Sequence, residues 1–280
     1  MTTHLLVALT PVHVGTGIDV GSINLPLARE THTRWPNVPG SSLKGALRAR
    51  ATYRSIDAEA LRKAFGGEHE DADHKGGLRF TDANMLAMPV RCIHHGYVLI
   101  TCPLALARFA REISDAPAVP QPDLDVALCA PDADAKIGVR DNQTPISDRG
   151  ATAVIYLEHL DWLLRGDTTT GHWVDRLKKW TGTDEVEWDR LVVVHDDVFA
   201  YALAAWTMHR TRNAVGEDGI VEDGLLYSVE YLAPESVLWC DIFDADSHEQ
   251  ALPKPGQPFV IGGHTGTGCG RVVFLREATT

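Results

Sequence analysis

The pattern of hydrophobic and polar positions indicates a fold that begins with a strand. Residues 4–11, HLLVALTP, are dense in β-forming side chains and end at Pro11, which predicts a core strand of about seven residues. Residues 78–101 contain three further β-rich pieces separated by short turns, and residues 236–275 contain three closing strands. Most of the predicted sheet therefore comes from the two ends of the chain and from the part before residue 101.

Helical spacing appears in a few places only. Residues 39–54 carry apolar positions three and four apart, with Ser41 or Ser42 as the expected N-cap, and Pro103 is placed as the first residue of a second helix. Two later helices are predicted from apolar stripes, one formed by Trp173, Leu177 and Trp180 and one by Phe199, Ala202, Leu203 and Trp206. Few helices among many strands favour an α+β fold built on an antiparallel sheet.

Two long stretches follow neither period. Residues 12–39 are punctuated by glycine and proline, and residues 112–150 hold five of the fifteen prolines. Both are predicted to be irregular insertions into the core. Because the chain has no internal repeat and no linker rich enough to divide it, we predict a single elaborated domain over residues 1–280.

Composition excludes several classes of protein. A hydrophobic content of 44% and a charged content of 23% are typical of globular proteins. No apolar run is long enough to span a membrane, and the N-terminus lacks the basic start of a signal peptide, so we expect a cytoplasmic protein without a membrane partner. The cysteines are odd in number, widely spread and without a C-x-x-C motif, which favours reduced thiols over disulfides or a zinc site.

Charge is distributed unevenly. The net charge of -12 argues against a nucleic-acid partner, but residues 29–54 carry six basic residues against the single acid Glu30. Lys44 and Arg48 lie four residues apart, so they share a face of the first predicted helix. This basic segment on an acidic chain is a candidate polyanion-binding surface, and a solvated helix face is the alternative.

Signatures of common enzymes are missing. The sequence contains no G-x-S-x-G, H-E-x-x-H or Walker A motif, and His69 and His74 in an acidic loop have no spacing that fixes a metal geometry. Two glycine-rich stretches remain, at residues 13–21 and 261–271. The second leads into a strand and not a helix, so it does not form a dinucleotide loop, but its glycines permit close approach of a polyanion.

The combination of these segments resembles a known family. Residues 13–50 are similar to the N-terminal signature of the RAMP superfamily of CRISPR-associated proteins, and in particular to the repeated backbone subunit of the type III-B (Cmr) complex. Residues 64–91, residues 195–237 and the late glycine loop keep the family's order, and PGSSLKGALR together with that loop is highly specific. Residues 112–190 match only loosely.

The resemblance implies an RRM-like (ferredoxin-like) palm with a β-hairpin thumb, for which residues 210–227 are the candidate. It also implies partners: CRISPR RNA, complementary target RNA, other Cmr subunits and further copies of this chain stacked along one guide. The residues that the resemblance assigns to RNA binding are Arg29, Ser41, Ser42, Lys44, Arg48, Arg210, Arg212, Gly262 and Gly263. A helix N-terminus with neighbouring cations is a ready phosphate site.

The family cuts target RNA with an aspartate in the loop after the first strand, using Mg²⁺ or Mn²⁺. The matching position holds Asn24, whose neutral amide neither binds a metal as an anion nor accepts a proton as a carboxylate does. Asp19 lies five residues earlier, with nothing in the spacing to place it at the same point. His13 and Glu230 match other positions of the family's site.

We therefore expect a guide-RNA-binding subunit whose endoribonuclease activity is lost with the aspartate. Asn24 is compatible with a naturally silent subunit and with a deliberate replacement. The alternative function is a stand-alone metal-dependent RNA-processing endoribonuclease, with His13 and His32 as general acid and base. A third, an adaptor that binds only protein, would contain no RNA.

Overall fold

The computed structural model describes residues 1–15, 23–67, 74–139, 153–181, 186–212, 227–244 and 248–277. The chain divides into two compact units. Unit 1 comprises residues 1–84 and 207–275, and unit 2 comprises residues 85–206 and 276–280. The prediction of a single domain stays a prediction.

Unit 1 is built on an antiparallel sheet whose central strand is β1 (Thr2–Ala8), buried at six of its seven positions. This confirms the predicted first strand. β1 pairs with β12 (Val237–Asp244) on one side and with β14 (Arg271–Leu275) on the other. The sheet is extended by β13 (Phe259–Val260) beside β14 and by β3 (Leu78–Phe80) beside β12.

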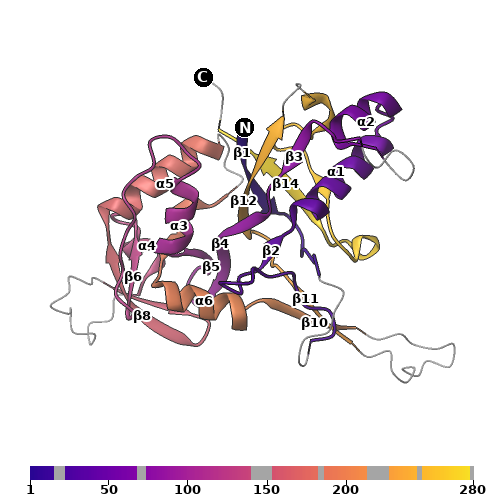
Figure 1. Ribbon diagram of the computed structural model, residues 1–280. Coiled ribbons are helices and arrows are strands. Elements are labelled where there is room, and N and C mark those ends of the chain that lie inside the picture. The colour runs from indigo at the N-terminus through magenta and orange to yellow at the C-terminus, as the bar shows by residue number, and fades with distance from the viewer. Residues whose placement is uncertain are drawn as a thin grey trace, which may run out of the picture. The chain divides into compact units, whose positions relative to one another are not determined.

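Two helices lie beside this sheet, α1 (Gly40–Tyr53) and α2 (Ala58–Phe65) (Figure 1). The prediction that Ser41 or Ser42 caps α1 is wrong, because the helix begins at Gly40 and no side chain caps it from position 39. The backbone N–H of Gly40 instead donates to Asp82 Oδ1 at 2.8 Å. A Cβ at Gly40 would stand 2.5 Å from the carbonyl oxygen of Phe80, so the helix can start here only with glycine.

The remaining strands of unit 1 are β2 (Asn37–Val38), which pairs with the start of β4 (Ala83–Cys92), and the separate pair β10 (Met208–Arg212) and β11 (Tyr227–Tyr231). β10 and β11 run side by side at the lower right of Figure 1. They contain both ends of the candidate thumb, residues 210–227. Its residues 213–226 lie outside the described residues, so the thumb stays a prediction.

Unit 2 contains a six-stranded, barrel-like sheet. Its strands follow the order β4, β5 (Gly96–Thr101), β9 (Leu191–Val193), β6 (Val126–Cys129), β8 (Leu160–Gly166) and β7 (Ala153–Leu157). The pairing of Cys92 in β4 with Leu157 in β7 joins the first strand to the last. The expectation of a purely antiparallel sheet is wrong for this unit, because β5 pairs in parallel with β9 and β6 with β8. Long connections that contain helices permit such parallel pairs.

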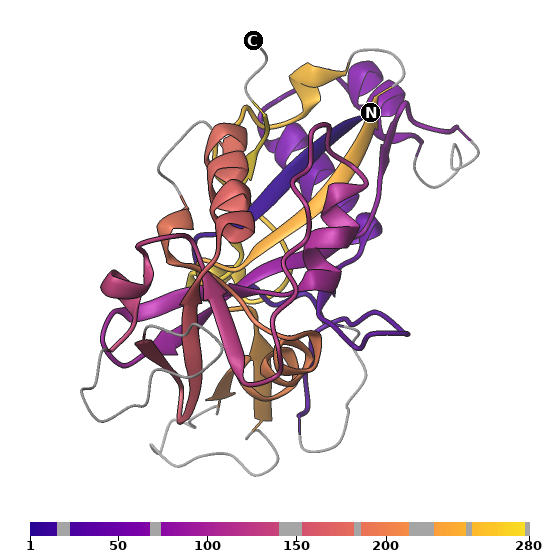
Figure 2. The same cartoon turned by 90° about the vertical axis from the view of Figure 1, so that its left-hand side faces the viewer.

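The helices of unit 2 are α3 (Pro103–Ala110), α4 (Asp134–Ile137), α5 (Thr168–Thr181) and α6 (Asp196–Ala205). Pro103 is the first residue of α3, as predicted. Trp173 and Trp180 on α5 are buried and lie beside Phe109 of α3, with the ring centroids of Phe109 and Trp180 5.0 Å apart. Figure 2 shows α5 along its length beside the strands. These tryptophans are core residues, which confirms the apolar stripe.

Residues 112–150 are more ordered than the sequence indicates. They contain β6, whose four residues are all buried, and α4, while residues 140–150 lie outside the described residues. β6 forms because β8 and β9 supply its hydrogen-bonding partners on both sides. A strand of four residues between prolines has little signal of its own.

The α+β fold class is confirmed, whereas the RRM-like palm stays a prediction. All five cysteines are free and buried, as expected for reduced thiols. Burial raises the pKa of the Cys129 thiol to about 12, which keeps it protonated. Three short 3₁₀ helices, η2 (Trp188–Arg190), η3 (Glu249–Ala251) and η4 (Thr265–Thr267), complete the described elements. No helix within the described ranges has the length and apolar character needed to cross a membrane.

Candidate functional site

Backbone hydrogen bonds join both ends of the loop after β1 to one edge of β11. Val12 exchanges two backbone hydrogen bonds with Leu232, directly after β11. Leu25, two residues after the described chain resumes at Ile23, donates to the carbonyl of Ser228 and accepts from the N–H of Glu230. The opposite edge of β11 pairs with β10. The loop therefore presents His13 and Asn24 along a strand that lies more than 200 residues later in the chain.

Asn24 is exposed and its amide oxygen is held by β11. The backbone N–H of Ser228 donates to Asn24 Oδ1 at 2.9 Å, and the backbone N–H of Asn24 donates to Ser228 Oγ at 3.3 Å. A carboxylate oxygen would accept the same bond from Ser228. An aspartate at position 24 would therefore keep the side chain in place and add only a negative charge.

His13 is buried, with 7% of its surface exposed, and its ring is oriented by β11. Nδ1 lies 2.8 Å from the carbonyl oxygen of Glu230, and a carbonyl only accepts, so Nδ1 carries the proton. In the neutral ring Nε2 then has the free lone pair. The backbone of His13 is fixed by the late glycine loop, since the N–H of Gly263 donates to the His13 carbonyl at 2.8 Å.

Gly262 needs to be glycine for the same contact. Its φ is +73°, and a Cβ there would lie 2.1 Å from the carbonyl oxygen of His13. The two glycines that the resemblance assigns to RNA binding thus also join the glycine loop to the loop that carries Asn24.

Glu230 is enclosed by protein groups, with 1% of its surface exposed. Oε2 accepts from the N–H of Leu27 at 2.9 Å, and Oε1 accepts from Thr207 Oγ1 at 2.7 Å and from the Arg29 guanidinium. The side chain therefore positions the segment that follows Asn24. The catalytic role that the resemblance gives it stays a prediction.

Arg29 is occupied in the same network. One terminal nitrogen donates to Glu230 and the other to the carbonyl of Arg34 at 2.8 Å, and 16% of the side chain is exposed. Protein acceptors therefore hold the Arg29 guanidinium in place.

Glu230→Ala is expected to lower the free energy of unfolding by about 3 kcal/mol. The substitution leaves the N–H of Leu27, the hydroxyl of Thr207 and the charge of Arg29 without their acceptor, and breaking a buried ion pair costs about 3–5 kcal/mol. Urea titration of both proteins measures the loss, with Glu230→Gln as the control that keeps one acceptor oxygen. A loss below about 0.5 kcal/mol, the range of ordinary surface substitutions, would contradict the positioning role.

Sequence reasoning missed two residues that the structure places beside His13. The ring centroid of His13 lies 5.7 Å from that of Tyr231, which is fully buried, and 5.4 Å from that of His264. Burial, and after it Arg212 and His13, lowers the pKa of His264, so its ring is neutral over a wider pH range. His264 lies within the glycine loop that the sequence singled out, but attention to the glycines alone does not reveal it.

Arg210 and Arg212 surround Tyr231 from β10. The guanidinium carbon of Arg210 lies 5.6 Å from the centre of the Tyr231 ring. Arg212 donates through Nε to the Tyr231 hydroxyl at 3.1 Å and through a terminal nitrogen to Thr267 Oγ1 at 3.1 Å. The base of the candidate thumb is therefore linked to the glycine loop. His32 takes no part in these contacts: its side chain is 72% exposed and lies 3.8 Å from Glu30.

The described residues do not fit the divalent ion that the resemblance implies. Among them, no three His, Cys, Asp or Glu side chains lie close enough together to hold a metal. Asn24 is neutral, and both oxygens of Glu230 have protein partners. Asp19, the other candidate carboxylate, lies outside the described residues.

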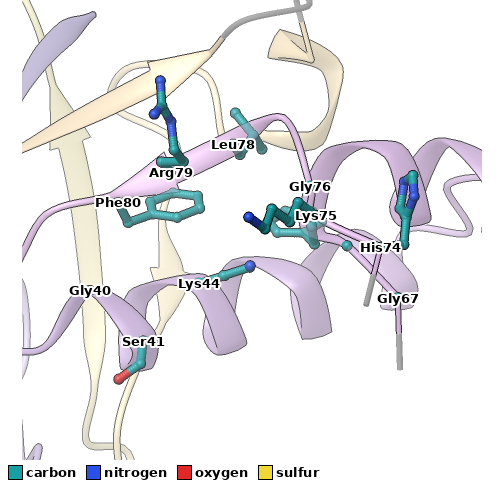
Figure 3. Close-up of a pocket in the computed structure, with 12 residues that line it drawn as sticks. Gly40, Ser41, Lys44, Gly67, His74, Lys75, Gly76, Leu78, Arg79 and Phe80 are labelled. Carbon is teal, nitrogen blue, oxygen red and sulfur yellow. The ribbon is translucent and has the colours of Figure 1, made fainter. Parts of the chain in front are cut away.

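The predicted RNA-binding residues of α1 separate onto different sides of the helix. Lys44 and Ser41 line a pocket of about 440 Å³ between α1, the segment after α2 and β3. Figure 3 shows the amines of Lys44 and Lys75 directed into this space beside the ring of Phe80, while Arg79 extends away from α1. Sequence reasoning missed Lys75 because it lies in a polar, glycine-flanked loop.

Arg48 and Ser42 do not line that pocket. Arg48 donates to the carbonyl of Gly66 at 3.1 Å, which ties α1 to the end of α2. Ser42 lies in a second groove, formed by α1 and the β13 segment, together with Gly262. Two predicted RNA-binding residues 220 positions apart in the sequence thus share one groove.

The chain matches the model of a known protein family. The family model described as the RAMP superfamily matches residues 5–273. The chain belongs to the RAMP superfamily. The resemblance found in the sequence is thereby confirmed.

Proteins similar to this RAMP chain include Cmr proteins. It is 31% identical over 301 residues to the CRISPR system Cmr endoribonuclease Cmr4 of Pyrococcus furiosus, covering 98% of this chain and 95% of that protein. The crystal structure of oligomeric Cmr4 from Pyrococcus furiosus matches with a TM-score of 0.71 and 24% identity, covering 100% of both chains. A chain of Type III-B Cmr-beta bound to cognate target RNA, solved by cryo-EM, matches with a TM-score of 0.73 and 20% identity, covering 98% and 96%. These two structures establish the fold.

Proposed function

We propose that this RAMP chain is a guide-RNA-binding backbone subunit of a type III-B Cmr complex, in which copies stack along one CRISPR RNA and the guide pairs with target RNA. The curated relative of nearly equal length is a Cmr protein, and a structural neighbour belongs to a complex bound to target RNA. The RRM-like palm, the thumb at residues 210–227 and a cytoplasmic location are parts of this proposal.

One observation supports it most strongly. The glycine loop contacts the loop of Asn24 through His13 and shares a groove with Ser42 of α1. Three segments that are remote in sequence thus contribute to neighbouring surfaces of unit 1. No acidic residue occurs between Glu30 and Asp57, so α1 is purely basic although the protein has a net charge of -12. A basic face of this kind suits the phosphate backbone of RNA, whose recognition does not depend on sequence.

The chain as it stands is proposed to bind target RNA and to cleave it slowly or not at all. Its relative is an endoribonuclease, but position 24 holds an amide. The alternative of a stand-alone processing enzyme that uses His13 with His32 receives no support from the geometry, because the imidazole beside His13 is His264. Mg²⁺ or Mn²⁺ remains an expected additive in assays of cleavage, with no ligand set among the described residues.

The test of this function is assembly on RNA. Purified chain is mixed with single-stranded RNAs of increasing length, and size-exclusion chromatography with light scattering gives the mass of each complex. We expect the number of bound copies to rise with RNA length and the affinity to fall as salt increases. Double-stranded RNA of the same lengths is the control.

Two other results would refute the proposal. A single copy that turns over the RNA at every length would support the processing enzyme. Absence of RNA binding at low salt, with the protein folded, would support the adaptor that binds only protein.

A further inference from the structure

The groove between α1 and the β13 segment contains charged and aromatic side chains that the proposed function has not yet used. It has a volume of about 760 Å³, and its sides carry Ser42, Arg50, Tyr53 and Arg54 of the α1 segment against Phe259 and Gly262. Gly45 of α1 also lines the groove. A Cβ at this position would meet nothing within 4 Å, so the groove is open beside the helix here. No acidic side chain lines it within the part of the chain that the structure describes.

Two guanidinium groups share this groove. Arg50 and Arg54 are one helical turn apart, and like charges at this spacing destabilise a helix. Burial, and after it the charge of Arg54, lowers the pKa of Arg50. Arg50 is held toward the β13 segment by a 2.7 Å bond to Gln257 Oε1. An anion bound between the guanidinium groups would relieve their repulsion.

An aromatic ring stands beside these cations. Tyr53 is 90% exposed, more than any other large hydrophobic side chain among the described residues. An exposed ring next to arginines in an open groove matches the way proteins bind single-stranded nucleic acid, where bases stack on aromatic faces and cations hold the backbone. Ala46, Ala49, Pro258 and Phe259 line the rest of this groove, and ligand sites typically combine such apolar walls with a few charged groups that fix the ligand.

We propose that this groove binds one nucleotide of single-stranded guide RNA, with its phosphate between Arg50 and Arg54 and its base stacked on Tyr53. The inference rests on the proposed function and specifies the path of the guide. The guide would run past Ser42 and Gly262 along the side of α1 opposite to Lys44. Tyr53, Arg50 and Arg54 are then RNA-binding residues in addition to those that the sequence indicated.

The test compares RNA affinities of single variants at several salt concentrations. Tyr53→Ala is expected to weaken binding about 5- to 150-fold, the effect of losing one base–aromatic stack, whereas Tyr53→Phe retains the ring and the affinity. Arg54→Gln should reduce the slope of log affinity against log salt by about one. Tyr201→Ala removes an exposed tyrosine of unit 2 and serves as the matched control. Since Tyr53 is 90% exposed, thermal unfolding of Tyr53→Ala should match that of the original protein.

The outcomes separate this inference from the function on which it rests. If Tyr53→Ala and Arg54→Gln bind RNA unchanged while Lys44→Glu weakens binding, the groove is not an RNA site and the proposed function stands. If Tyr53→Ala keeps its affinity for an RNA that holds one copy but reduces the number of copies on long RNA, the groove receives a neighbouring copy and the inference is overturned. If the original protein binds no RNA, the proposed function fails and the inference fails with it.

Discussion

Reversing the charges of Lys44 and Arg48 together is expected to abolish loading of guide RNA. Lys44 directs its amine into the pocket that also receives Lys75, and Arg48 lies one turn further along the same basic helix. Hydrogen bonds to charged groups contribute about 1.5–3 kcal/mol each, so Lys44→Glu with Arg48→Glu should weaken binding by about 100-fold or more. The salt dependence should become shallower because fewer phosphates are neutralised.

The structure sharpens this experiment. Arg48 also holds the carbonyl of Gly66, so the double variant can lose the junction of α1 and α2 as well as two charges. Lys44→Glu alone separates the two effects, since no helix junction depends on Lys44 among the described contacts. Lys179→Glu, on an exposed position of α5, is the control for charge reversal itself. Unchanged affinity and salt slope in the folded double variant would place the guide elsewhere.

Asn24→Asp is expected to raise cleavage of target RNA about 10²- to 10⁴-fold, the usual contribution of a general acid or base. The assay uses the complete complex with guide and complementary target in the presence of Mg²⁺ or Mn²⁺, and regularly spaced products are expected. The substitution should not disturb the loop, because an aspartate oxygen accepts the same bond from the N–H of Ser228. Target binding should therefore be similar for the two proteins.

Two variants define the role of position 24. Asn24→Ser retains a polar side chain without a carboxylate and should remain as slow as the original protein. If the original protein cuts within a few-fold of the aspartate form, position 24 is not at the chemical centre. An inactive Asn24→Asp protein that still binds target would instead identify a subunit whose remaining site residues no longer support cleavage.

Local patterns in the sequence determined much of this protein. The spacing of Trp173, Leu177 and Trp180 predicted a buried face of α5, and Pro103 marked the start of α3. Such features depend on residues three and four apart or on a single proline ring, so they can be predicted from the sequence without knowledge of the fold. The family could be identified as readily, because its motifs occur in order along nearly the whole chain, with only a loose match over residues 112–190.

Other features were decided by partners far away in the chain. Asp82 rather than a serine accepts the first N–H of α1, and β6 forms in a proline-rich stretch because β8 and β9 pair with it. The sequence of a short segment does not specify which strand will lie beside it. Its β propensity alone therefore predicts its structure poorly.

The candidate site shows the same division. Its residue types were visible in the sequence, but the fold decided which of them meet. Glu230 was predicted to be a catalytic residue, and its carboxylate is enclosed by Leu27, Arg29 and Thr207. His264 was not predicted, and its ring lies beside that of His13. These contacts join residues separated by up to 251 positions. Only the pairing of β11 with the loop after β1, together with the turn of the glycine loop against that loop, brings them within reach of one another.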